Sequence, residues 1–483
     1  MKGPFVQAQW GNITAGDILS PIGGELISGS SETVFRGLST DSRTISGSDI
    51  FWALRGEKFD GHDFIPQALE KGASGILVEK DHTIDRMMIK PQAVIAVRDS
   101  LKALGDLAGW WRHQHDIRVA AITGSAGKTT TKEMTAGILS VSSKVLKTQG
   151  NYNNLIGLPL TLFRLGEDHQ KAVLEMGMNH FGEIGRLTEI ADPDIGLITN
   201  VGRAHLEGLG DITGVARAKV EMVEKISREG QVILNGDDEL LMKTALPFKR
   251  PTITFGLGPK NDIRAKDVRR LGHKGLSFAL RYHGKKVDLH LSAPGFQNVY
   301  NALAAASIAL CMDEPIDHIV EGLKRFEGIP GRFKMARLRG GITLLDDTYN
   351  ANPTSLQAAM DSLKDLVCNG GRIIIGLGDM LELGDETVSA HLDAGGMIAD
   401  LGAAYLTAMG EHAEELVRGA LREGFPSDRA VVVDSHQDML KGIKSVTRKG
   451  DLIFLKGSRK MGLEKVVEGL KRAYKEEQNG QIN

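Results

Sequence analysis

The chain has little that would cross-link it or carry it into a membrane. It has two cysteines in 483 residues, Cys311 and Cys368, and neither has histidine or cysteine neighbours at metal-site spacing. This excludes a disulfide framework and a structural zinc site, and it fits a reducing cytosol. No apolar run approaches the roughly 18 residues of a membrane span, and residues 1–19 lack the apolar segment of a secretory signal. We expect a soluble, cytoplasmic protein without membrane insertion.

Excess charge is also lacking. The 59 basic and 61 acidic residues leave a net charge of −2, which gives no electrostatic reason to expect nucleic acid or an anionic membrane as a partner. The length suggests about three domains. Nothing in the sequence requires an obligate assembly, so a monomer that acts on small molecules is expected.

One stretch, VAAITGSAGKTTTKEMTAGIL at 119–139, dominates what is present. An apolar strand, a glycine turn and a helix form a phosphate cradle, in which backbone N–H groups and the helix dipole face the anion. Ile122 stands where the usual pattern has its first glycine, so this is a shortened variant. Thr129 is placed to ligate a nucleotide-bound Mg²⁺. The candidate ATP-binding residues here are Gly124, Ser125, Ala126, Gly127, Lys128, Thr129 and Thr130.

Polar residues follow the next predicted strands at their carboxyl ends. Glu175 ends one strand, and Asn200 and His205 lie just beyond another. In open α/β sheets, ligands bind outside the carboxyl ends of the strands. We therefore expect Lys128, Glu175 and His205 to face one crevice.

The remaining pattern predicts an α/β protein of three domains. Residues 1–112 form a small α/β unit whose last helix, 101–114, is the domain connection. Residues 113–329 repeat strand and helix as in a parallel sheet, with an antiparallel stretch at 251–292. A linker at 326–342 leads to a doubly wound, Rossmann-like unit at 330–483. That unit lacks a G-x-G-x-x-G fingerprint, which argues against a dinucleotide cofactor and an oxidoreductase.

Several polar residues and loops allow both a ligand-binding and a purely structural interpretation. The polar loops at 39–43 and 56–62 could bind a hydroxyl- and phosphate-rich ligand or could be ordinary turns. Asn298 and Asn301 could face a base or cap their helix. Lys219, on the helix at 214–226, could simply be solvated.

Taken together, TGSAGKTT, AKVE, NVYNALAA and PGRF, with Glu175 and His205 at strand ends, resemble the Mur ligase family of ATP-dependent amide-bond ligases across the whole chain. Further strings are similar to the branch of the family that adds D-alanyl-D-alanine to a UDP-N-acetylmuramoyl (UDP-MurNAc) tripeptide. These are TDSRTISGSDIFWALRGEKFDGHDF, GNYNNLIGLP, EMGMNHFGEI, DDTYNANP, LGDMLELG and LKGSRKMGLE. The resemblance implies a UDP-sugar domain (1–112), an ATP-binding domain (113–329) and a C-terminal ligase domain (330–483).

The resemblance also implies roles for individual residues. The catalytic residues would be Lys128, Glu175, His205 and Lys219. Mg²⁺ would be held by Thr129 and Glu175, and a second Mg²⁺ by His205 and an N6-carboxylated Lys219. ATP would further contact Asn298, Asn301, Arg332 and Asp347. The other substrates would be held by Thr40, Asp41, Ser42, Arg43, Asp60, Gly61, His62, Asn153, Asn154, Tyr349, Asn352, Lys456, Ser458 and Arg459.

The implied reaction is phosphorylation of the tripeptide carboxylate by ATP, followed by attack of the dipeptide amine on the acyl phosphate. Closure of three domains around the substrates would exclude water, with a hinge at 326–332. Two other functions stay open. One is a sister ligase, such as the enzyme that adds the third peptide residue or a folylpolyglutamate synthase. The other is a P-loop regulatory ATPase.

Overall fold

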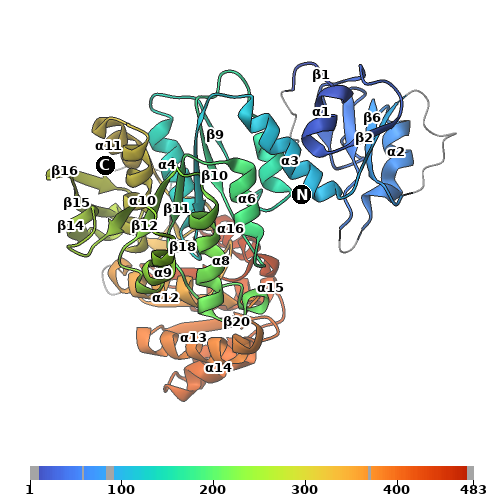
Figure 1. Cartoon of the computed structure of the whole chain (residues 1–483). Helices are drawn as coiled ribbons and strands as arrows, with labels where there is room; N and C mark the ends of the chain where they lie inside the picture. Colours follow the sequence, from blue (N-terminus) through green and yellow to red (C-terminus); the bar gives the residue numbers. More distant parts are fainter. Residues whose placement is uncertain (1–9, 57–58, 83–91, 368–370, 476–483) are drawn as a thin grey trace.

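The computed structural model describes residues 10–56, 59–82, 92–367 and 371–475, which build three sheet-centred units in chain order (Figure 1). The N-terminal unit lies to one side, and the other two are in direct contact. Cys368, residues 57–58 of the predicted loop and residues 1–9 of the N-terminal stretch lie outside the described residues. Within the described ranges, no helix has both the length and the apolar character needed to cross a membrane.

The N-terminal unit is a five-stranded sheet of order β2-β7-β6-β5-β4, parallel except for β2. Side chains alternate between its faces, so Ile50 and Trp52 pack with α1 while Phe51 and Ala53 pack with α2. Its elements are β1 (Ile13–Thr14), α1 (Ala15–Ile22), β2 (Glu25–Ser28), β3 (Val34–Phe35), β4 (Gly37–Ser39), β5 (Asp49–Trp52), η1 (Gly61–Phe64), α2 (Ile65–Glu70), β6 (Gly75–Glu79), β7 (Ala93–Val97) and α3 (Ser100–His113).

Helix α3 packs on α1 at one side and on α5 (Gly157–Leu162) and α6 (Glu183–Ala191) of the central unit at the other, as predicted for the domain connection. The central sheet has the order β16-β15-β14-β13-β12-β11-β8-β10-β9. Its strands are β8 (Arg118–Thr123), β9 (Val145–Lys147), β10 (Lys171–Glu175), β11 (Ile195–Ile198), β12 (Gln231–Asn235), β13 (Thr252–Gly256), β14 (Ile263–Arg270), β15 (Leu276–Tyr282) and β16 (Lys285–Leu291).

The strands from β9 to β14 run parallel, and β15 and β16 extend the sheet as an antiparallel hairpin. The predicted antiparallel stretch at 251–292 is therefore wrong for β13, which is parallel to both of its neighbours. Alternating polarity reports that a strand is half exposed, but it carries no information on the direction of the neighbouring strands.

Helices cover both faces of the central sheet. Alternate residues of β8 face opposite layers, so Ala120 and Ile122 pack with α4, α10 and α11, while Val119 and Ala121 pack with α3, α5, α6 and α8. The helices are α4 (Lys128–Leu139), α5 (Gly157–Leu162), α6 (Glu183–Ala191), α7 (Leu206–Leu209), α8 (Ile212–Lys225), α9 (Glu239–Ala245), η3 (Leu246–Phe248), η4 (Gly272–Lys274), α10 (Gln297–Cys311) and α11 (Ile316–Lys324).

The C-terminal sheet has the order β17-β18-β22-β19-β20-β21, parallel except at β17. Helices lie on both faces, which confirms a doubly wound unit. Its elements are β17 (Lys334–Leu338), β18 (Ile342–Asp347), α12 (Pro353–Leu363), η5 (Lys364–Leu366), β19 (Ile373–Gly378), η6 (Gly384–Glu386), α13 (Thr387–Leu401), β20 (Tyr405–Met409), α14 (Ala413–Arg422), η7 (Ser427–Arg429), β21 (Ala430–Val432), α15 (His436–Val446), β22 (Leu452–Lys456), η8 (Arg459–Met461) and α16 (Glu464–Tyr474).

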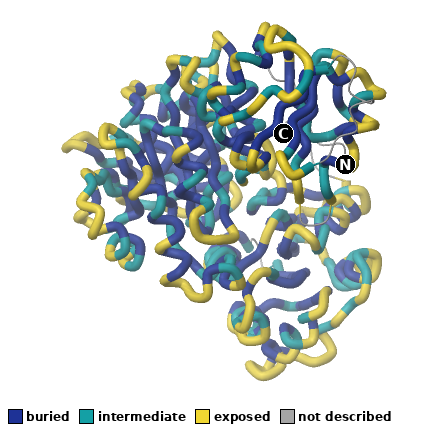
Figure 2. The backbone as a smooth tube through the Cα atoms, turned by 45° about the vertical axis from the view of Figure 1, so that its right-hand side comes forward, coloured by how far each residue is buried: buried dark blue, intermediate teal, exposed yellow. Residues whose placement is uncertain are grey.

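The prediction of a linker at 326–342 is wrong, because this segment contains the edge strand β17, which pairs antiparallel with β18. Lys334 and Arg337 interrupt the apolar pattern of this strand, as charged residues often do on sheet edges. Figure 2 shows the buried backbone concentrated in the strands of the sheets, with the exposed backbone in loops and outer helices. The residues that a ligand can reach therefore lie mainly in the loops at the strand ends.

Candidate active site

The glycine turn lies at the switch point of the central sheet. β8 ends at Thr123 and α4 begins at Lys128, while β10 and β11 flank β8 on its two sides. Later strands extend the sheet in both directions from β8, so the loops diverge and leave a crevice above its carboxyl end. A cavity of about 1010 Å³ opens there, lined mainly by residues of the central and C-terminal units, with Leu101 of α3 at its edge.

Two positions in the turn require glycine. Gly124 has φ 147°, and a Cβ there would lie 1.8 Å from Oγ1 of Thr199. Gly127 has φ 83°, and a Cβ there would lie 2.3 Å from Oδ1 of Asn301 on α10. Only glycine adopts these backbone angles with so little space. The turn is therefore packed directly against the start of α10.

Asn200 holds the turn from the other side. Its Oδ1 accepts a hydrogen bond from the Ala126 N–H at 2.9 Å, and its Nδ2 donates to the Ala126 carbonyl at 3.1 Å. Its own carbonyl accepts from the Ser125 N–H at 3.0 Å. Sequence analysis predicted that Asn200 lies just beyond a strand end but assigned it no role. That position was the one feature from which its role in holding the turn could have been predicted.

Two lysines lie near this turn, of which Lys128 is partly buried and Lys219 fully buried. Nζ of Lys128 donates to the Gly124 carbonyl at 2.6 Å, and burial lowers its pKa, opposed by the nearby Glu175 carboxylate. Lys219 on α8 is 1 % exposed, and its ammonium has no hydrogen-bond or ion-pair partner among the described residues. Burial, with a contribution from Lys128, holds the pKa of Lys219 well below its ordinary value. The solvated alternative for Lys219 is therefore excluded.

The donor set fits a divalent cation. Glu175 is 2 % exposed; its Oε1 accepts from Nδ2 of Asn153 at 3.0 Å, while its buried Oε2 has no partner within the described chain. The described residues contain no group of three or more His, Cys, Asp or Glu side chains able to hold a metal. Mg²⁺ commonly takes one or two carboxylates and completes its shell with phosphates and water. The orphaned oxygen of Glu175 and the Thr129 hydroxyl suit that mode of binding.

His205 meets a residue of the C-terminal unit. Its Nδ1 lies 2.7 Å from Oε2 of Glu382, and this contact holds the pKa of Glu382 below its ordinary value. Nearby, the Arg203 guanidinium is 2.5 Å from a carboxylate oxygen of Glu386. Glu382 lies in the LGDMLELG string, but no feature of that string distinguishes it from its neighbours. It is a functional candidate that sequence reasoning missed.

Glu382 projects from a loop that is fastened at several points. Nε2 of His391 accepts from the Met380 N–H at 3.0 Å, and its Nδ1 lies 2.7 Å from the Thr387 carbonyl. The Leu381 N–H donates to Oγ of Ser458 at 2.9 Å. Burial lowers the pKa of His391, which favours the neutral ring that these contacts require. The loop is therefore held in one position relative to β19 and β22.

Cationic and aromatic side chains form the C-terminal wall of the cavity. Arg332 and Arg459 both lie against the Tyr349 ring, with guanidinium carbons 4.0 Å and 5.4 Å from its centroid. Behind them, Nζ of Lys456 lies 2.5 Å from Oδ2 of Asp347. Burial raises the pKa of Asp347 and lowers that of Lys456, and their mutual contact opposes both shifts.

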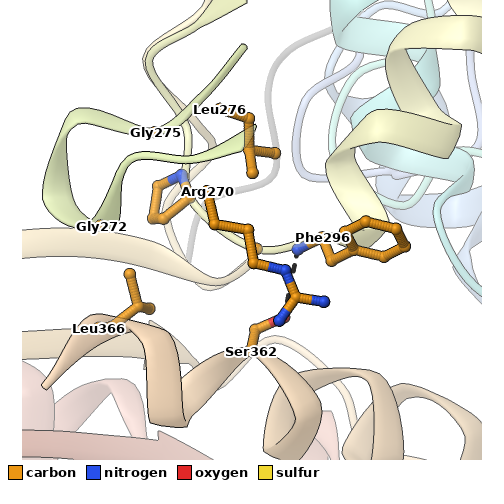
Figure 3. Close-up of a pocket in the computed structure, with 9 residues that line it drawn as sticks. Arg270, Gly272, Gly275, Leu276, Phe296, Ser362 and Leu366 are labelled. Atoms are coloured by element: carbon orange, nitrogen blue, oxygen red, sulfur yellow. Dashed lines mark hydrogen bonds between the residues drawn. The ribbon is translucent and has the colours of Figure 1, made fainter. Parts of the chain in front are cut away.

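The start of α10 completes the opposite wall. Nδ2 of Asn298 donates to the Pro294 carbonyl at 2.6 Å, and Nδ2 of Asn301 donates to Oδ1 of Asn298 at 3.0 Å. The N-cap position is Phe296, without a side-chain cap, so the capping alternative for the two asparagines is excluded. Figure 3 shows a second contact between the units at this point, where the Phe296 N–H donates to Oγ of Ser362 on α12 at 3.2 Å.

The structure brings most predicted central and C-terminal site residues together. The following line the cavity: Ser125, Ala126, Gly127, Lys128, Thr129, Thr130, Asn153, Asn154, Glu175, His205, Asn298, Asn301, Arg332, Asp347, Tyr349, Asn352, Lys456 and Arg459. The following do not: Gly124, Lys219, Ser458, Thr40, Asp41, Ser42, Arg43, Asp60, Gly61 and His62. The expectation that Lys128, Glu175 and His205 face one crevice is confirmed.

The predicted N-terminal residues form a separate group. Asp41 and Arg43 make an ion pair at 2.8 Å, and the Ser42 hydroxyl donates to Oε1 of Gln67. His62 is 2 % exposed; its Nδ1 lies 2.5 Å from Oδ1 of Asp60, and its Nε2 accepts from the Glu79 N–H. Both ring nitrogens of His62 are therefore occupied inside the loop, and the imidazole braces it from within.

Three family models match successive parts of the chain. The model "Mur ligase family, catalytic domain" matches residues 34–112, "Mur ligase middle domain" matches 122–309, and "Mur ligase, glutamate ligase domain" matches 331–459. The matches cover all three sheet-centred units in chain order.

Individual relatives match over nearly their full length. A UDP-N-acetylmuramoyl-tripeptide–D-alanyl-D-alanine ligase of Bacillus subtilis is 36 % identical over 442 residues, covering 91 % of this chain and 94 % of the relative. The crystal structure of MurF from Acinetobacter baumannii has a TM-score of 0.85 at 32 % identity, covering 95 % and 99 %. MurF from Thermotoga maritima in complex with ADP has a TM-score of 0.80 at 27 % identity, covering 90 % and 97 %.

Proposed function

Because the chain belongs to the Mur ligase family, we propose that it joins D-alanyl-D-alanine to the terminal carboxylate of a UDP-MurNAc tripeptide at the expense of ATP. The observation that carries this proposal is the extent of the match, since relatives with that activity in their names align over about nine-tenths of both chains. The product would be the UDP-MurNAc pentapeptide used in peptidoglycan synthesis. We propose 1–112, 113–329 and 330–483 as the functional domains.

The cavity supports ATP as the phosphoryl donor, in agreement with the ADP complex of a relative. The triphosphate would lie over the N-terminus of α4, where free N–H groups, Lys128 and the Thr129 hydroxyl face it. Arg332 would reach the γ-phosphate, since its guanidinium already contacts Oγ1 of Thr129 at 3.2 Å. Asn298 and Asn301 would approach the adenine, and Asp347 the ribose.

Glu175 and Thr129 would hold the Mg²⁺ that accompanies ATP, and His205 and Lys219 a second one. Bound there, the ions would neutralise phosphate charge next to the incoming carboxylate. Lys219 fits this role only as a carboxylated side chain, because a cation beside a metal ion would repel it. Its burial favours the neutral amine, which is the form that reacts with CO₂.

The reaction proceeds in two steps, each of which forms one bond and breaks another. The tripeptide carboxylate oxygen attacks the γ-phosphorus of ATP and ADP leaves, which gives an acyl phosphate. The dipeptide amine then attacks the carbonyl carbon, loses a proton, and phosphate leaves. Lys128 and Arg332 stabilise charge on the transferring phosphoryl group, while Tyr349, Asn352 and the loop 456–459 would position the peptide substrates.

The N-terminal loops would hold the nucleotide-sugar end of the acceptor. Thr40, Asp41, Ser42 and Arg43 follow β4, and Asp60 and Gly61 lie after β5 where its loop enters η1, so both groups lie beyond strand ends. His62 would support this loop from inside. The proposed enzyme acts in the cytoplasm as a monomer.

The test is phosphate release with ATP, Mg²⁺, D-alanyl-D-alanine and a UDP-MurNAc tripeptide, with the product identified by mass spectrometry. We expect release only when both the tripeptide and the dipeptide are present, with a pentapeptide product. Tripeptides ending in diaminopimelate and in lysine are compared in parallel to name the preferred acceptor. Turnover with a free amino acid instead of the dipeptide would identify a sister ligase. Hydrolysis that needs neither substrate would identify a regulatory ATPase.

A further inference from the structure

Helix α12 of the C-terminal unit contacts the central unit near both of its ends. In its first turn, Oγ1 of Thr354 accepts a hydrogen bond from the Arg203 N–H at 3.0 Å. In its last turn, Oγ of the buried Ser362 accepts one from the Phe296 N–H at 3.2 Å (Figure 3). Thr354 and Ser362 lie about 12 Å apart along the helix axis, given a rise of about 1.5 Å per residue. One helix therefore holds two separate segments of the central unit.

The sequence of α12, PTSLQAAMDSL, gives the helix two different faces. The apolar residues recur at helical spacing and are buried in the same core as β19, so the helix is fixed within its own unit. They are Leu356, Ala359, Met360 and Leu363. Thr354, Ala358 and Ser362 recur at every fourth position and form a second stripe. Thr354 and Ala358 of this stripe also line the cavity.

The segment that meets Thr354 supports the glycine turn. Gly202, next to Arg203, donates its N–H to Oγ of Ser125 at 2.8 Å, and its carbonyl accepts from the same hydroxyl at 3.1 Å. A Cβ at Gly202 would lie 2.4 Å from Oγ1 of Thr354, so the chain approaches α12 closely at this point. The first contact of α12 is therefore one residue away from a direct support of the phosphate-binding turn.

The segment that meets Ser362 supports the opposite wall of the cavity. Phe296 is the N-cap residue of α10, and Asn301 on this helix packs directly against Gly127 of the turn. Ser362 itself is outside the cavity; it lines a small pocket between α12, the start of α10 and the turn that joins β14 to β15 (Figure 3). Any effect of Ser362 on a ligand in the cavity must therefore act through the position of α10 or α12.

We propose that α12 docks on the central unit as one rigid lid over the cavity, with Thr354 and Ser362 as positioning residues, and that ADP leaves when both contacts open together. This inference rests on the proposed binding of ATP in the cavity. The glycine turn and α12 line the same cavity, so movement of the helix exposes a nucleotide that lies between them. The opposite model is a pair of local contacts that open independently of each other.

Amide hydrogen exchange, measured by mass spectrometry on the full-length protein without nucleotide, tests how α12 docks. The variants are Ser362→Ala and Thr354→Val, with Thr354→Ser as the conservative variant that keeps the hydroxyl. Ser307→Ala on α10 is the matched control. Like Ser362, whose Oγ lies 3.0 Å from the Ala358 carbonyl, Ser307 is buried and its Oγ donates within its helix, to the Leu303 carbonyl at 2.8 Å. Unchanged far-UV circular dichroism and Tm show that each variant is folded.

We expect Ser362→Ala to speed exchange about 2- to 10-fold in the peptide that contains Arg203, at the other end of α12, because undocking no longer breaks one of the two hydrogen bonds. Thr354→Val should have the same effect on the peptide that contains Phe296. Thr354→Ser and Ser307→Ala should resemble the wild type in both peptides. Faster exchange confined to the altered end of α12 would overturn the proposal, as would equally fast exchange at both ends in Ser307→Ala.

Release of the fluorescent nucleotide mant-ADP, measured by stopped flow with Mg²⁺ present, provides the functional readout. We expect Ser362→Ala and Thr354→Val each to speed release about 2- to 10-fold, while Ser307→Ala leaves it unchanged. Since Ser362 is outside the cavity, its effect cannot come from a lost contact with the nucleotide. Unchanged release in Ser362→Ala would overturn the lid function. Wild-type affinity for mant-ADP in Lys128→Ala would instead overturn the proposed ATP site, and the lid function with it, while the exchange experiment decides the docking of α12 without nucleotide.

Discussion

The guanidinium of Arg332 stacks on the ring of Tyr349, with 4.0 Å between the guanidinium carbon and the ring centroid. The same guanidinium donates a hydrogen bond to Oγ1 of Thr129 on α4 at 3.2 Å. One side chain therefore connects the phosphate-binding turn with the C-terminal unit, and the tyrosine ring sets its direction.

Replacing Tyr349 by leucine should lower kcat/KM for ATP about 2- to 30-fold, because a cation–π contact contributes about 0.5–2 kcal/mol. The assay is phosphate release at saturating tripeptide and dipeptide. Tyr349→Phe is the control, since it keeps the ring and removes only the hydroxyl. An equal loss in Tyr349→Phe would show that the hydroxyl, not the ring, is the important group.

Replacing Lys128 by alanine should lower kcat about 100-fold or more, because it removes a charge that faces the transferring phosphoryl group. Lys144→Ala provides the control, since Lys144 is an exposed lysine paired with Asp168 after the same helix. Both variants are compared by steady-state phosphate release and by Tm. Retention of wild-type kcat in Lys128→Ala would remove this lysine from the catalytic machinery.

Incubation with ¹³C-labelled bicarbonate should give a carbamate resonance in the ¹³C NMR spectrum, because burial holds the pKa of Lys219 well below its ordinary value and so favours the neutral amine that reacts with CO₂. Lys219→Met should abolish the signal. Lys132→Met should keep it: Lys132 is equally buried, but its Nζ donates to the Thr148 carbonyl at 2.7 Å and lies 3.0 Å from Glu133. A signal that survives in Lys219→Met would assign the carbamate elsewhere.

The loop that carries Glu382 should become less stable in mild acid through His391. Burial lowers the pKa of His391 below its ordinary 6.5, so between that lowered value and 6.5 the unfolded chain binds a proton that the folded chain does not. Stability is therefore lost as the pH falls through this window. His391→Leu should have a lower Tm at pH 7.5, because it loses two hydrogen bonds worth about 1 kcal/mol each.

The decisive quantity is the pH dependence of Tm. Between pH 7.5 and 5.5 the wild type should lose more of its Tm than His391→Leu does, because the variant lacks the titrating ring. Differential scanning calorimetry at several pH values provides the measurement. Parallel Tm curves for the two proteins would mean that His391 does not titrate in this range.

The phosphate-binding region could be predicted from sequence because local rules specify it. Gly124 and Gly127 mark a turn with positive φ, and the apolar run before them and the helix after them fix its place at a strand end. Glu175 and His205 follow strands of the same parallel sheet, so their convergence with Lys128 depended only on strand direction.

Features that depend on contacts between distant segments could not be predicted in this way. The direction of β13 and the existence of β17 are set by pairing with other strands, which alternation of polarity does not report. Glu382 lies against His205 because the loops after β19 and β11, which belong to different sheets, meet at the cavity. The burial of His62 follows from packing inside its loop, and its sequence context is that of an ordinary polar turn.

The N-terminal unit contributes its connecting helix to the cavity edge through Leu101, while its polar loops lie elsewhere. If the nucleotide-sugar is anchored in those loops, the acceptor itself must span the gap to the phosphate-binding turn. The distance between the N-terminal loops and the phosphate-binding turn would then set the length of peptide that an acceptor needs. An acceptor that is one residue short would bind at its sugar end yet leave its carboxylate out of reach of the γ-phosphate. Selection among successive precursors could thus arise from distance, without recognition of every side chain.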